Sequence, residues 1–162
     1  MSQNVFPKVS IVTPSFNQAT FLEQTLRSVL EQDYPNLEYI VIDGGSRDGS
    51  LEIIQKYADQ LSYWQSQPDQ GQTDAINQGF AHASGEIFAW LNSDDLLLPG
   101  AVSAAVRALH EHPEAAMVYG DALLINAEGK TIGKFPAAQT DYRKLRRGYV
   151  HIPQQASFFR AE

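Results

Sequence analysis

Two adjacent carboxylates, Asp94 and Asp95, follow the apolar run Ile87–Leu91 after a short Asn92-Ser93 step. Such a run is typical of a strand buried on both faces. Neighbouring carboxylates at its end repel each other unless a cation or hydrogen-bond donors compensate their charge. Mg²⁺ and Mn²⁺ prefer oxygen ligands, and Mg²⁺ is often held by one or two carboxylates together with substrate phosphates. We therefore expect Asp94, with Asp95 as a second ligand, to hold a divalent metal that bridges a diphosphate. The alternative is that one of the two caps a helix.

A second polar cluster, Asp43–Ser50, follows the expected strand at 39–42. One interpretation is a glycine-rich turn in which Asp48 or Ser50 caps the next helix. The other gives Asp43 hydrogen bonds from a nucleobase or ribose, with the paired glycines letting a flat base approach the backbone. No Gly-x-Gly-x-x-Gly motif follows the first strand, so a dinucleotide-binding fingerprint is absent.

Two further side chains could take part in chemistry. His151 lies in a loop-like segment and could approach the metal or the diphosphate. Asp121 directly follows an expected strand and turn, where it either faces an acceptor or caps the turn.

The elements that must position these groups alternate between β-branched runs and helical patterns, which indicates an α/β protein with a mostly parallel sheet covered by helices. Strands are expected at 9–13, 39–42, 61–65, 87–91, 116–119 and 131–135. A capping box, Thr20–Glu23, is expected to open the first helix. Ligands of such sheets collect beyond the carboxyl ends of the strands, so the segments 14–17, 43–45 and 92–95 should converge on one rim.

Composition limits the classes of partner. The 162 residues fit one domain, and 43% of them are hydrophobic. The formal charge of −7 argues against a nucleic-acid partner. The one basic cluster, Arg143–Arg147, is expected to be a solvated helix face or to meet a phosphorylated or membrane-bound acceptor. The chain has no cysteine and no apolar run of membrane-spanning length. We expect a cytoplasmic protein, with peripheral association at the inner face of a membrane as the alternative.

The order of the motifs resembles family 2 of the glycosyltransferases, a group of inverting enzymes with the GT-A (Rossmann-like) fold. Val9–Asn17 resembles the family's opening strand and nucleoside-contacting loop, and Asp43–Ser50 its Asp-x-x-Ser-x-Asp-Gly turn. Gly71–Gly79 resembles its Ala-x-Asn-x-Gly helix, and Asn92–Asp95 stands at the position of its DxD motif. The resemblance covers nearly the whole chain.

The resemblance implies transfer of a sugar from a nucleoside-diphosphate sugar, with UDP as the first choice, to a hydroxyl of a saccharide or lipid-linked acceptor. Asp94 would bind Mn²⁺ or Mg²⁺, which would act as a Lewis acid on the departing diphosphate. The implied nucleotide-sugar site comprises Pro14, Phe16, Asn17, Asp43, Gly45, Asp69, Gly71, Asn77, Asn92 and Ser93.

Two residues depart from the family pattern. Asn92 replaces the first Asp of DxD, which removes one negative charge and should weaken metal affinity. Ile76 stands where many relatives carry Arg or Lys, which removes a phosphate contact.

A carboxylate base must deprotonate the acceptor hydroxyl. The segment 152–160 resembles the one that precedes the family's base-bearing region, so the base is expected beyond Glu162, with Asp121 as the internal candidate. The expected consequences are poor transfer and uncovered apolar surface near Ile152, Phe158 and Phe159, which would favour homo-oligomers.

Three alternatives follow from the residues. A noncatalytic nucleotide-sugar-binding fragment would share the donor motifs and lack the base. A receiver-like phosphoacceptor domain would need its acidic pair after the first strand, where the chain has Pro14-Ser15. A sugar nucleotidyltransferase would need a glycine-rich loop with Lys or Arg at that place, and this loop is not present.

Overall fold

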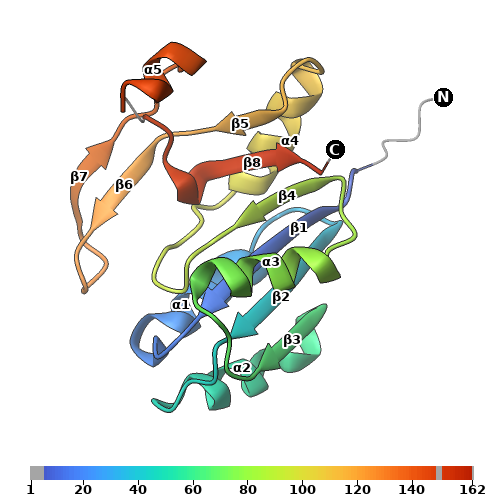
Figure 1. Cartoon of the computed structure of the whole chain (residues 1–162), viewed down its shortest axis with the longest axis vertical. Coiled ribbons are helices and arrows are strands. Elements are labelled where there is room, and N and C mark those ends of the chain that lie inside the picture. The colour runs from blue at the N-terminus through green and yellow to red at the C-terminus, as the bar shows by residue number, and fades with distance from the viewer. Residues whose placement is uncertain (1–5, 149–150, 162) are drawn as a thin grey trace.

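The computed structural model describes residues 6–148 and 151–161. At its centre is a six-stranded sheet with strand order β3-β2-β1-β4-β8-β5 (Figure 1). The strands are β1 (Val9–Ser15), β2 (Leu37–Asp43), β3 (Tyr63–Ser66), β4 (Ile87–Trp90), β5 (Met117–Tyr119) and β8 (Ser157–Arg160). The strands from β3 to β4 pair in parallel, whereas β8 is antiparallel to both β4 and β5. The expected α/β class and mostly parallel sheet are therefore confirmed.

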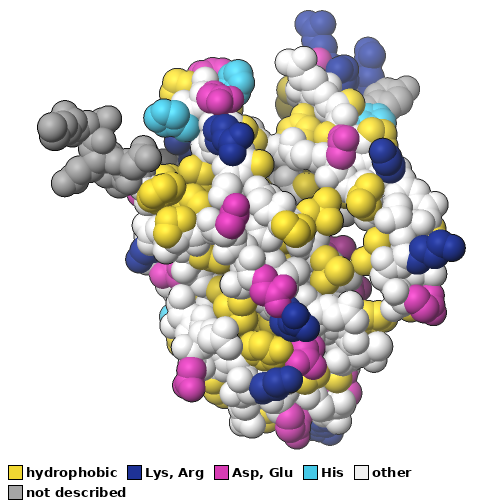
Figure 2. Space-filling view, turned by 180° about the vertical axis from the view of Figure 1, so that it is seen from behind, with side chains coloured by type: hydrophobic (Ala, Val, Ile, Leu, Met, Phe, Trp, Pro, Cys, Tyr) yellow, Lys and Arg dark blue, Asp and Glu magenta, His cyan; other side chains and the backbone are white. Residues whose placement is uncertain are grey.

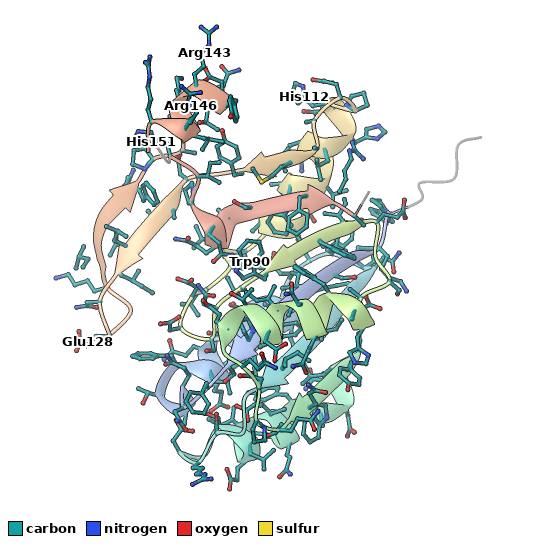
Figure 3. All side chains as sticks on the ribbon, in the orientation of Figure 1. Trp90, His112, Glu128, Arg143, Arg146 and His151 are labelled. Atoms are coloured by element: carbon teal, nitrogen blue, oxygen red, sulfur yellow. The ribbon has the colours of Figure 1, made fainter. Side chains whose placement is uncertain are left out.

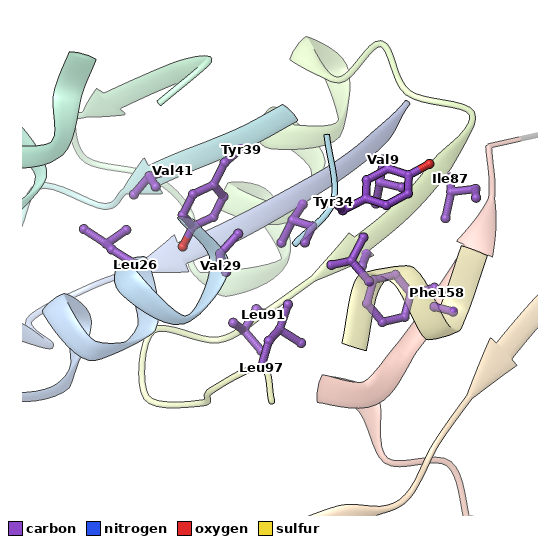
Figure 4. Close-up of a cluster of buried hydrophobic side chains, with 14 of the residues drawn as sticks. Val9, Leu26, Val29, Tyr34, Tyr39, Val41, Ile87, Leu91, Leu97 and Phe158 are labelled. Carbon is purple, nitrogen blue, oxygen red and sulfur yellow. The ribbon is translucent and has the colours of Figure 1, made fainter. Parts of the chain in front are cut away.

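Helices cover both faces of the sheet, because alternate side chains of its buried strands point to opposite sides. The main helices are α1 (Ala19–Leu30), α2 (Ser50–Tyr57), α3 (Gln72–His82) and α4 (Ala101–Glu111). Val9 and Ile11 of β1 pack in the larger core with α1, α2 and α4, part of which Figure 4 shows. Val12 belongs to the smaller core beneath α3. None of the helices within the described residues has the length and hydrophobicity needed to cross a bilayer.

Helix α3 lies unusually close to β1. A Cβ at Gly79 would overlap the side chain of Val12, so only glycine allows this approach. The contact holds the second half of α3 against the middle of β1, and the beginning of the same helix lines the candidate site.

An arm, residues 122–148, extends from this body (Figure 1). It contains the two-stranded antiparallel sheet of β6 (Ala122–Ile125) and β7 (Thr131–Phe135), followed by the short helix α5 (Tyr142–Arg146). The strand expected at 131–135 is confirmed, and the helix expected for the basic cluster is α5, whose five residues are all exposed.

The structure corrects the expected capping box. Helix α1 begins at Ala19, and Glu23 accepts hydrogen bonds from Lys56 and Tyr57. The amide at the start of this helix donates instead to Asp48 Oδ2, 2.9 Å away, so a distant turn replaces the local box.

The prediction of uncovered apolar surface at the end of the chain is also wrong for Phe158. This side chain is only 3% exposed, because β8 is inserted between β4 and β5 and Phe158 packs in the larger core. Phe159 is half-buried and packs edge-to-face against Phe80, Phe88 and Trp90. Ile152 is half-buried as well. The argument for homo-oligomers from this surface therefore loses its basis.

Candidate functional site

A cavity of about 850 Å³ opens beyond the carboxyl ends of β1, β2 and β4. It lies beside the point where the strand order changes direction, between β1 and β4, which is the usual place for ligands in open α/β sheets. Loops that are distant in sequence meet there, as expected because the carboxyl ends of parallel strands lie at one edge of the sheet. The lining residues are Pro14, Ser15, Phe16, Asn17, Gln18, Gly44, Gly45, Arg47, Pro68, Asp69, Gly71, Gln72, Ala75, Asn92, Ser93 and Asp94.

Asp43 is completely buried at the end of β2 and does not line the cavity. Its Oδ2 accepts hydrogen bonds from the amide of Gly45 (3.1 Å), the amide of Ser46 (2.9 Å) and the hydroxyl of Ser66 (2.6 Å). Its Oδ1 accepts one from the hydroxyl of Ser46. The structure thus uses this carboxylate to fold the glycine turn and does not present it for the expected direct nucleoside contact.

The glycine turn is joined to the loop after β1. The Asn17 amide donates to Ser46 Oγ over 2.7 Å, and the Arg47 amide donates to Asn17 Oδ1 over 3.0 Å. Asn17 has a positive φ of 53°, a conformation that asparagine tolerates better than most residues. The two loops therefore form one cross-bonded wall that holds Phe16 and Arg47 at the cavity.

Asp48 completes this wall and supports the capping interpretation of the turn. Besides the α1 amide, it accepts hydrogen bonds from the amide (3.1 Å) and the hydroxyl (2.7 Å) of Ser50. The amide of Ala19 is the main cause that holds the pKa of Asp48 below its ordinary value. A single exposed carboxylate thus connects the beginnings of two helices.

The opposite side of the cavity is formed by the beginning of α3. Asp69 Oδ1 accepts a hydrogen bond of 2.8 Å from the amide of Gly71, which caps α3 with a φ of +108°. The Asp69 carboxylate lies so close to Gly44 that a Cβ there would be 2.9 Å from Oδ2. Gly71, Gln72 and Ala75 of this helix start all line the cavity, so the positive end of the α3 dipole faces it.

Asn92 is held by amide contacts on two sides. Gln72 Nε2 donates to Asn92 Oδ1 over 2.8 Å. Asn92 Nδ2 donates to Asp95 Oδ2 and to Gln154 Oε1, each over 3.2 Å. Gln154 also donates from Nε2 to the carbonyl of Trp90, at the end of β4, over 2.7 Å. The loop after β4 is therefore fixed from α3 and from the segment before β8.

The two adjacent carboxylates have different surroundings. Asp94 lines the cavity, is exposed, and accepts no hydrogen bond from any residue within 6–148 and 151–161. Asp95 is half-buried beneath the loop. Burial raises its pKa, the hydrogen bond from Asn92 opposes this effect, and the charge of Asp94 raises the pKa further. Asp94 is thus the free carboxylate of the pair.

These residues fit a metal ion only in part. Within the described residues, no group of three or more His, Asp or Glu side chains is placed to hold a metal ion. One free carboxylate, Asp94, matches the habit of Mg²⁺-type ions to take one or two carboxylates, with substrate phosphates and water supplying the rest. The arrangement is therefore compatible with a metal that binds together with a diphosphate.

Some expected site residues lie elsewhere. Asn77 is exposed on α3 and does not line the cavity. His151 lies beside α5, at the end of the arm opposite Glu128 (Figure 3), and its carbonyl accepts a hydrogen bond from the amide of Ala138. Asp121 Oδ1 accepts a hydrogen bond of 2.8 Å from the amide of Ala137, 16 positions further along the chain, and so joins the two ends of the β6–β7 hairpin. Glu162 lies outside the described residues.

Arg47 is the lining residue that sequence reasoning missed. Among the described residues that line the cavity, it is the one Lys or Arg. Asp43 and Asp48 stand at specified positions of the Asp-x-x-Ser-x-Asp-Gly motif, whereas Arg47 stands at one of its unspecified positions. The available signal was its type and place: a basic side chain, in a turn already expected to contact a nucleotide, could contact the phosphates.

A second, largely apolar cavity of about 510 Å³ lies between α4, β5 and the arm. Apolar side chains are visible between the arm and the body in Figure 2. Asp95 and Asp121 are the two carboxylates among its described lining residues. Because Asp95 is bonded to Asn92, the two cavities share a wall.

Sequence comparisons identify relatives. Residues 10–161 match the family model described as Glycosyl transferase family 2. An uncharacterized glycosyltransferase of Mycobacterium tuberculosis (strain H37Rv) is 39% identical over 157 residues, which are 94% of this chain and 58% of that protein. The GalNAc(5)-diNAcBac-PP-undecaprenol beta-1,3-glucosyltransferase of Campylobacter jejuni is 36% identical over 133 residues, 80% of this chain and 42% of that enzyme. The chain thus spans about three fifths or less of these two relatives.

Solved structures share the fold. The mannosyltransferase PcManGT of Pyrobaculum calidifontis, solved in complex with GDP-Man and Mn²⁺, superposes with a TM-score of 0.66 at 27% identity, covering 76% of this chain and 37% of that one. TarS 1–349 of S. aureus, solved in complex with UDP-GlcNAc, superposes with a TM-score of 0.73 at 22% identity, covering 94% of this chain and 45% of that one. Its likeness concerns the fold alone. With its motifs, its sheet and these relatives taken together, the chain belongs to family 2 of the glycosyltransferases and has their GT-A fold.

Proposed function

We propose that the cavity beyond β1, β2 and β4 binds a nucleoside-diphosphate sugar together with Mn²⁺ or Mg²⁺, and that the protein transfers this sugar to an acceptor hydroxyl with inversion. The observation that carries the proposal is the free Asp94 carboxylate, which lines a cavity that also contains Arg47 and the beginning of α3. The GDP-Man and Mn²⁺ in the complex of PcManGT support this type of ligand.

The diphosphate has three sources of compensation in this chain. The Arg47 guanidinium can donate several hydrogen bonds to phosphate oxygens. The beginning of α3 offers amides and the positive end of a helix dipole, which together favour anions. Asp94 would hold a divalent cation against the same phosphates, and this cation would stabilise the charge on the departing diphosphate. A protein with a net charge of −7 needs such local compensation to bind an anion.

The nucleoside has an apolar and flat wall available. Pro14, near the end of β1, and Phe16, in the loop after it, line the cavity together with Gly44 and Gly45. Asp43 acts on the nucleoside indirectly in this proposal, because it fixes the backbone of the glycine turn. UDP remains our first choice of nucleotide and GDP the second, and the acceptor is proposed to be a saccharide or a lipid-linked saccharide, as the name of the Campylobacter jejuni relative suggests.

A ligand panel tests the proposal. Thermal unfolding is measured with UDP-, GDP- and dTDP-sugars, each with and without Mn²⁺, because a ligand that binds only the native state raises apparent stability. We expect a stabilisation by one nucleotide class that depends on the metal. Asp94→Asn should remove the metal dependence, whereas Asp59→Asn, an exposed carboxylate on the 3₁₀ turn after α2, should keep it. Metal-dependent binding that survives Asp94→Asn would refute the assignment of Asp94, and no binding of any nucleotide sugar would refute the proposed function.

Inversion is tested separately on the product. With a donor and acceptor identified, NMR of the new glycosidic bond should show the anomeric configuration opposite to that of the donor. Retained configuration would reject the inverting mechanism while leaving the donor site in place. Nucleotide-sugar binding without transfer to any acceptor would favour a binding role over catalysis.

A further inference from the structure

Charge is unevenly distributed between the arm and the rest of the chain. Residues 122–148 contain six Lys or Arg and two Asp or Glu, whereas the rest of the chain contains six Lys or Arg and seventeen Asp or Glu. Dark blue side chains stand along the outer edge of the arm, on the right in Figure 2. A protein of net charge −7 therefore carries one surface of opposite sign.

The basic side chains of the arm form no ion pairs within the part of the chain that the structure describes. No ion pair within 4 Å involves any of the six among residues 6–148 and 151–161, whereas Lys8, Arg27 and Lys56 of the body are each paired with a glutamate. The Asp141 carboxylate caps α5 by accepting a hydrogen bond of 2.9 Å from the amide of Lys144. The positive charge of α5 is therefore available to an external partner.

The same arm exposes apolar side chains. Every residue from 141 to 148 is exposed, and the side chains of Tyr142 and Leu145 are 75% and 41% exposed. Tyr142 and Leu145 are spaced by three and lie on one side of α5, and Arg146, four positions after Tyr142, is a neighbour of Tyr142 on the helix surface. Arg147 follows the helix directly. In the hairpin, Leu124 and Ile132 are 48% and 67% exposed. Basic and apolar groups thus occur together on one projecting part of the molecule.

We propose that the arm is a docking surface for an anionic lipid bilayer. Basic residues are attracted to a negatively charged membrane surface, which lowers their free energy there. Adjacent aromatic and aliphatic side chains can enter the region between headgroups and acyl chains. A nucleic acid would meet the strongly acidic remainder of the chain and would make no use of the exposed aliphatic groups. A bilayer can contact the arm while the acidic body stays in water. The docking requires no nucleotide and so stands independently of the donor site.

Vesicle co-sedimentation tests this docking. The probes are vesicles of phosphatidylcholine alone and vesicles with about one third phosphatidylglycerol, a fraction chosen to give a negative surface potential. The arm variant is Arg143→Gln/Arg146→Gln/Arg147→Gln. Its matched control, Arg27→Gln/Lys56→Gln/Arg107→Gln, removes the same charge from exposed sites on α1, α2 and α4. A third variant, Tyr142→Ser/Leu145→Ser, removes the apolar groups alone.

The wild type should bind the anionic vesicles and not the neutral ones, and its binding should fall as salt increases. Since each basic residue contributes roughly fivefold near such a surface, the arm variant should bind about 100-fold more weakly, whereas the control should stay within a few-fold of the wild type. The Tyr142→Ser/Leu145→Ser variant should also bind more weakly. Absence of binding to anionic vesicles, or equal losses in the arm variant and the control, would overturn the proposal. Competition by double-stranded DNA with no effect of the Tyr142→Ser/Leu145→Ser variant would replace the bilayer with a polyanion.

Discussion

Asp43 offers the sharpest test of how the donor cavity is built. Its buried carboxylate accepts four hydrogen bonds, of which three converge on Oδ2. A hydrogen bond to a charged group contributes about 1.5–3 kcal/mol, and a buried donor left without a partner costs about 1–3 kcal/mol. Asp43→Ala leaves all four hydrogen-bond donors without an acceptor. Allowing for relaxation of the turn, we expect the free energy of unfolding to fall by about 4 kcal/mol, which is large for one substitution.

Asp43→Asn separates the charge from the hydrogen bonds. The amide oxygen can take the place of Oδ2 and keep three bonds, while the amide nitrogen at the Oδ1 position can donate to the Ser46 hydroxyl, which can also accept. The three remaining bonds lose their charge assistance, so we expect a loss of about 2 kcal/mol. Ser66→Ala removes a single donor and should cost about 1 kcal/mol.

The assay combines urea unfolding with calorimetric nucleotide titration of the folded protein. If Asp43 acts by folding the turn, Asp43→Asn should lower stability and leave nucleotide affinity within a few-fold of the wild type. The reasoning fails if Asp43→Asn is as stable as the wild type and yet has lost nucleotide binding. That result would mean that the carboxylate contacts the ligand directly, as the resemblance to the family implies.

Three more substitutions test the surrounding contacts. Gly79→Ala should lower the free energy of unfolding by about 1–2 kcal/mol in urea titration, because its Cβ overlaps Val12. The control Gly120→Ala should be neutral, because a Cβ at Gly120 meets no atom within 4 Å; equal stabilities of the two variants would refute the close approach of α3 to β1. Asp48→Ala should cost about 1 kcal/mol at pH 7 through the lost cap. Because folding lowers the pKa of Asp48, the difference from the wild type should shrink as the pH falls below the ordinary pKa of an Asp side chain, about 3.9; a constant difference would contradict this origin. Burial raises the pKa of Asp95, so ionisation of this carboxyl group lowers the free energy of unfolding as the pH rises through that pKa. The stability of Asp95→Asn, measured in parallel unfolding curves, should therefore increase relative to the wild type between pH 3 and pH 7. A relative loss over that range would show that the ionised carboxylate is favoured in the folded protein.

The sequence predicted the rim of the site because its physical cause is local. Pro14, Gly45 and Asn92 lie at or just beyond the carboxyl ends of β1, β2 and β4. Because the carboxyl ends of parallel strands meet at one sheet edge, predicting their convergence needed only the strand positions. A helix at Gly71–Gly79 was expected from the resemblance to a family motif, and α3 confirms it.

Other features depended on contacts that no local pattern encodes. Asp43 looked like an exposed ligand because a strand-end carboxylate beside glycines fits that role, but its partner Ser66 comes from a different strand and closes it in. The start of α1 was assigned to a local box, although its amide bonds to Asp48, 29 positions further along. β8 escaped prediction because the segment Ser157–Arg160 has only four residues and pairs with strands far away in sequence.

The insertion of β8 has a consequence for the order in which the protein can fold. Its pairing with β4 joins Ile87 to Arg160, a contact of very high sequence separation, whereas β1 and β2 are joined by a single helical connection. Long-range pairings of this kind slow folding, because closing the intervening loop loses conformational entropy before the contact can form. On the ribosome, β4 remains an open edge until residue 160 has emerged, and an open edge can pair with another chain. The half that forms the donor cavity is therefore expected to fold first, and the β4 edge to be the place where nascent chains associate wrongly.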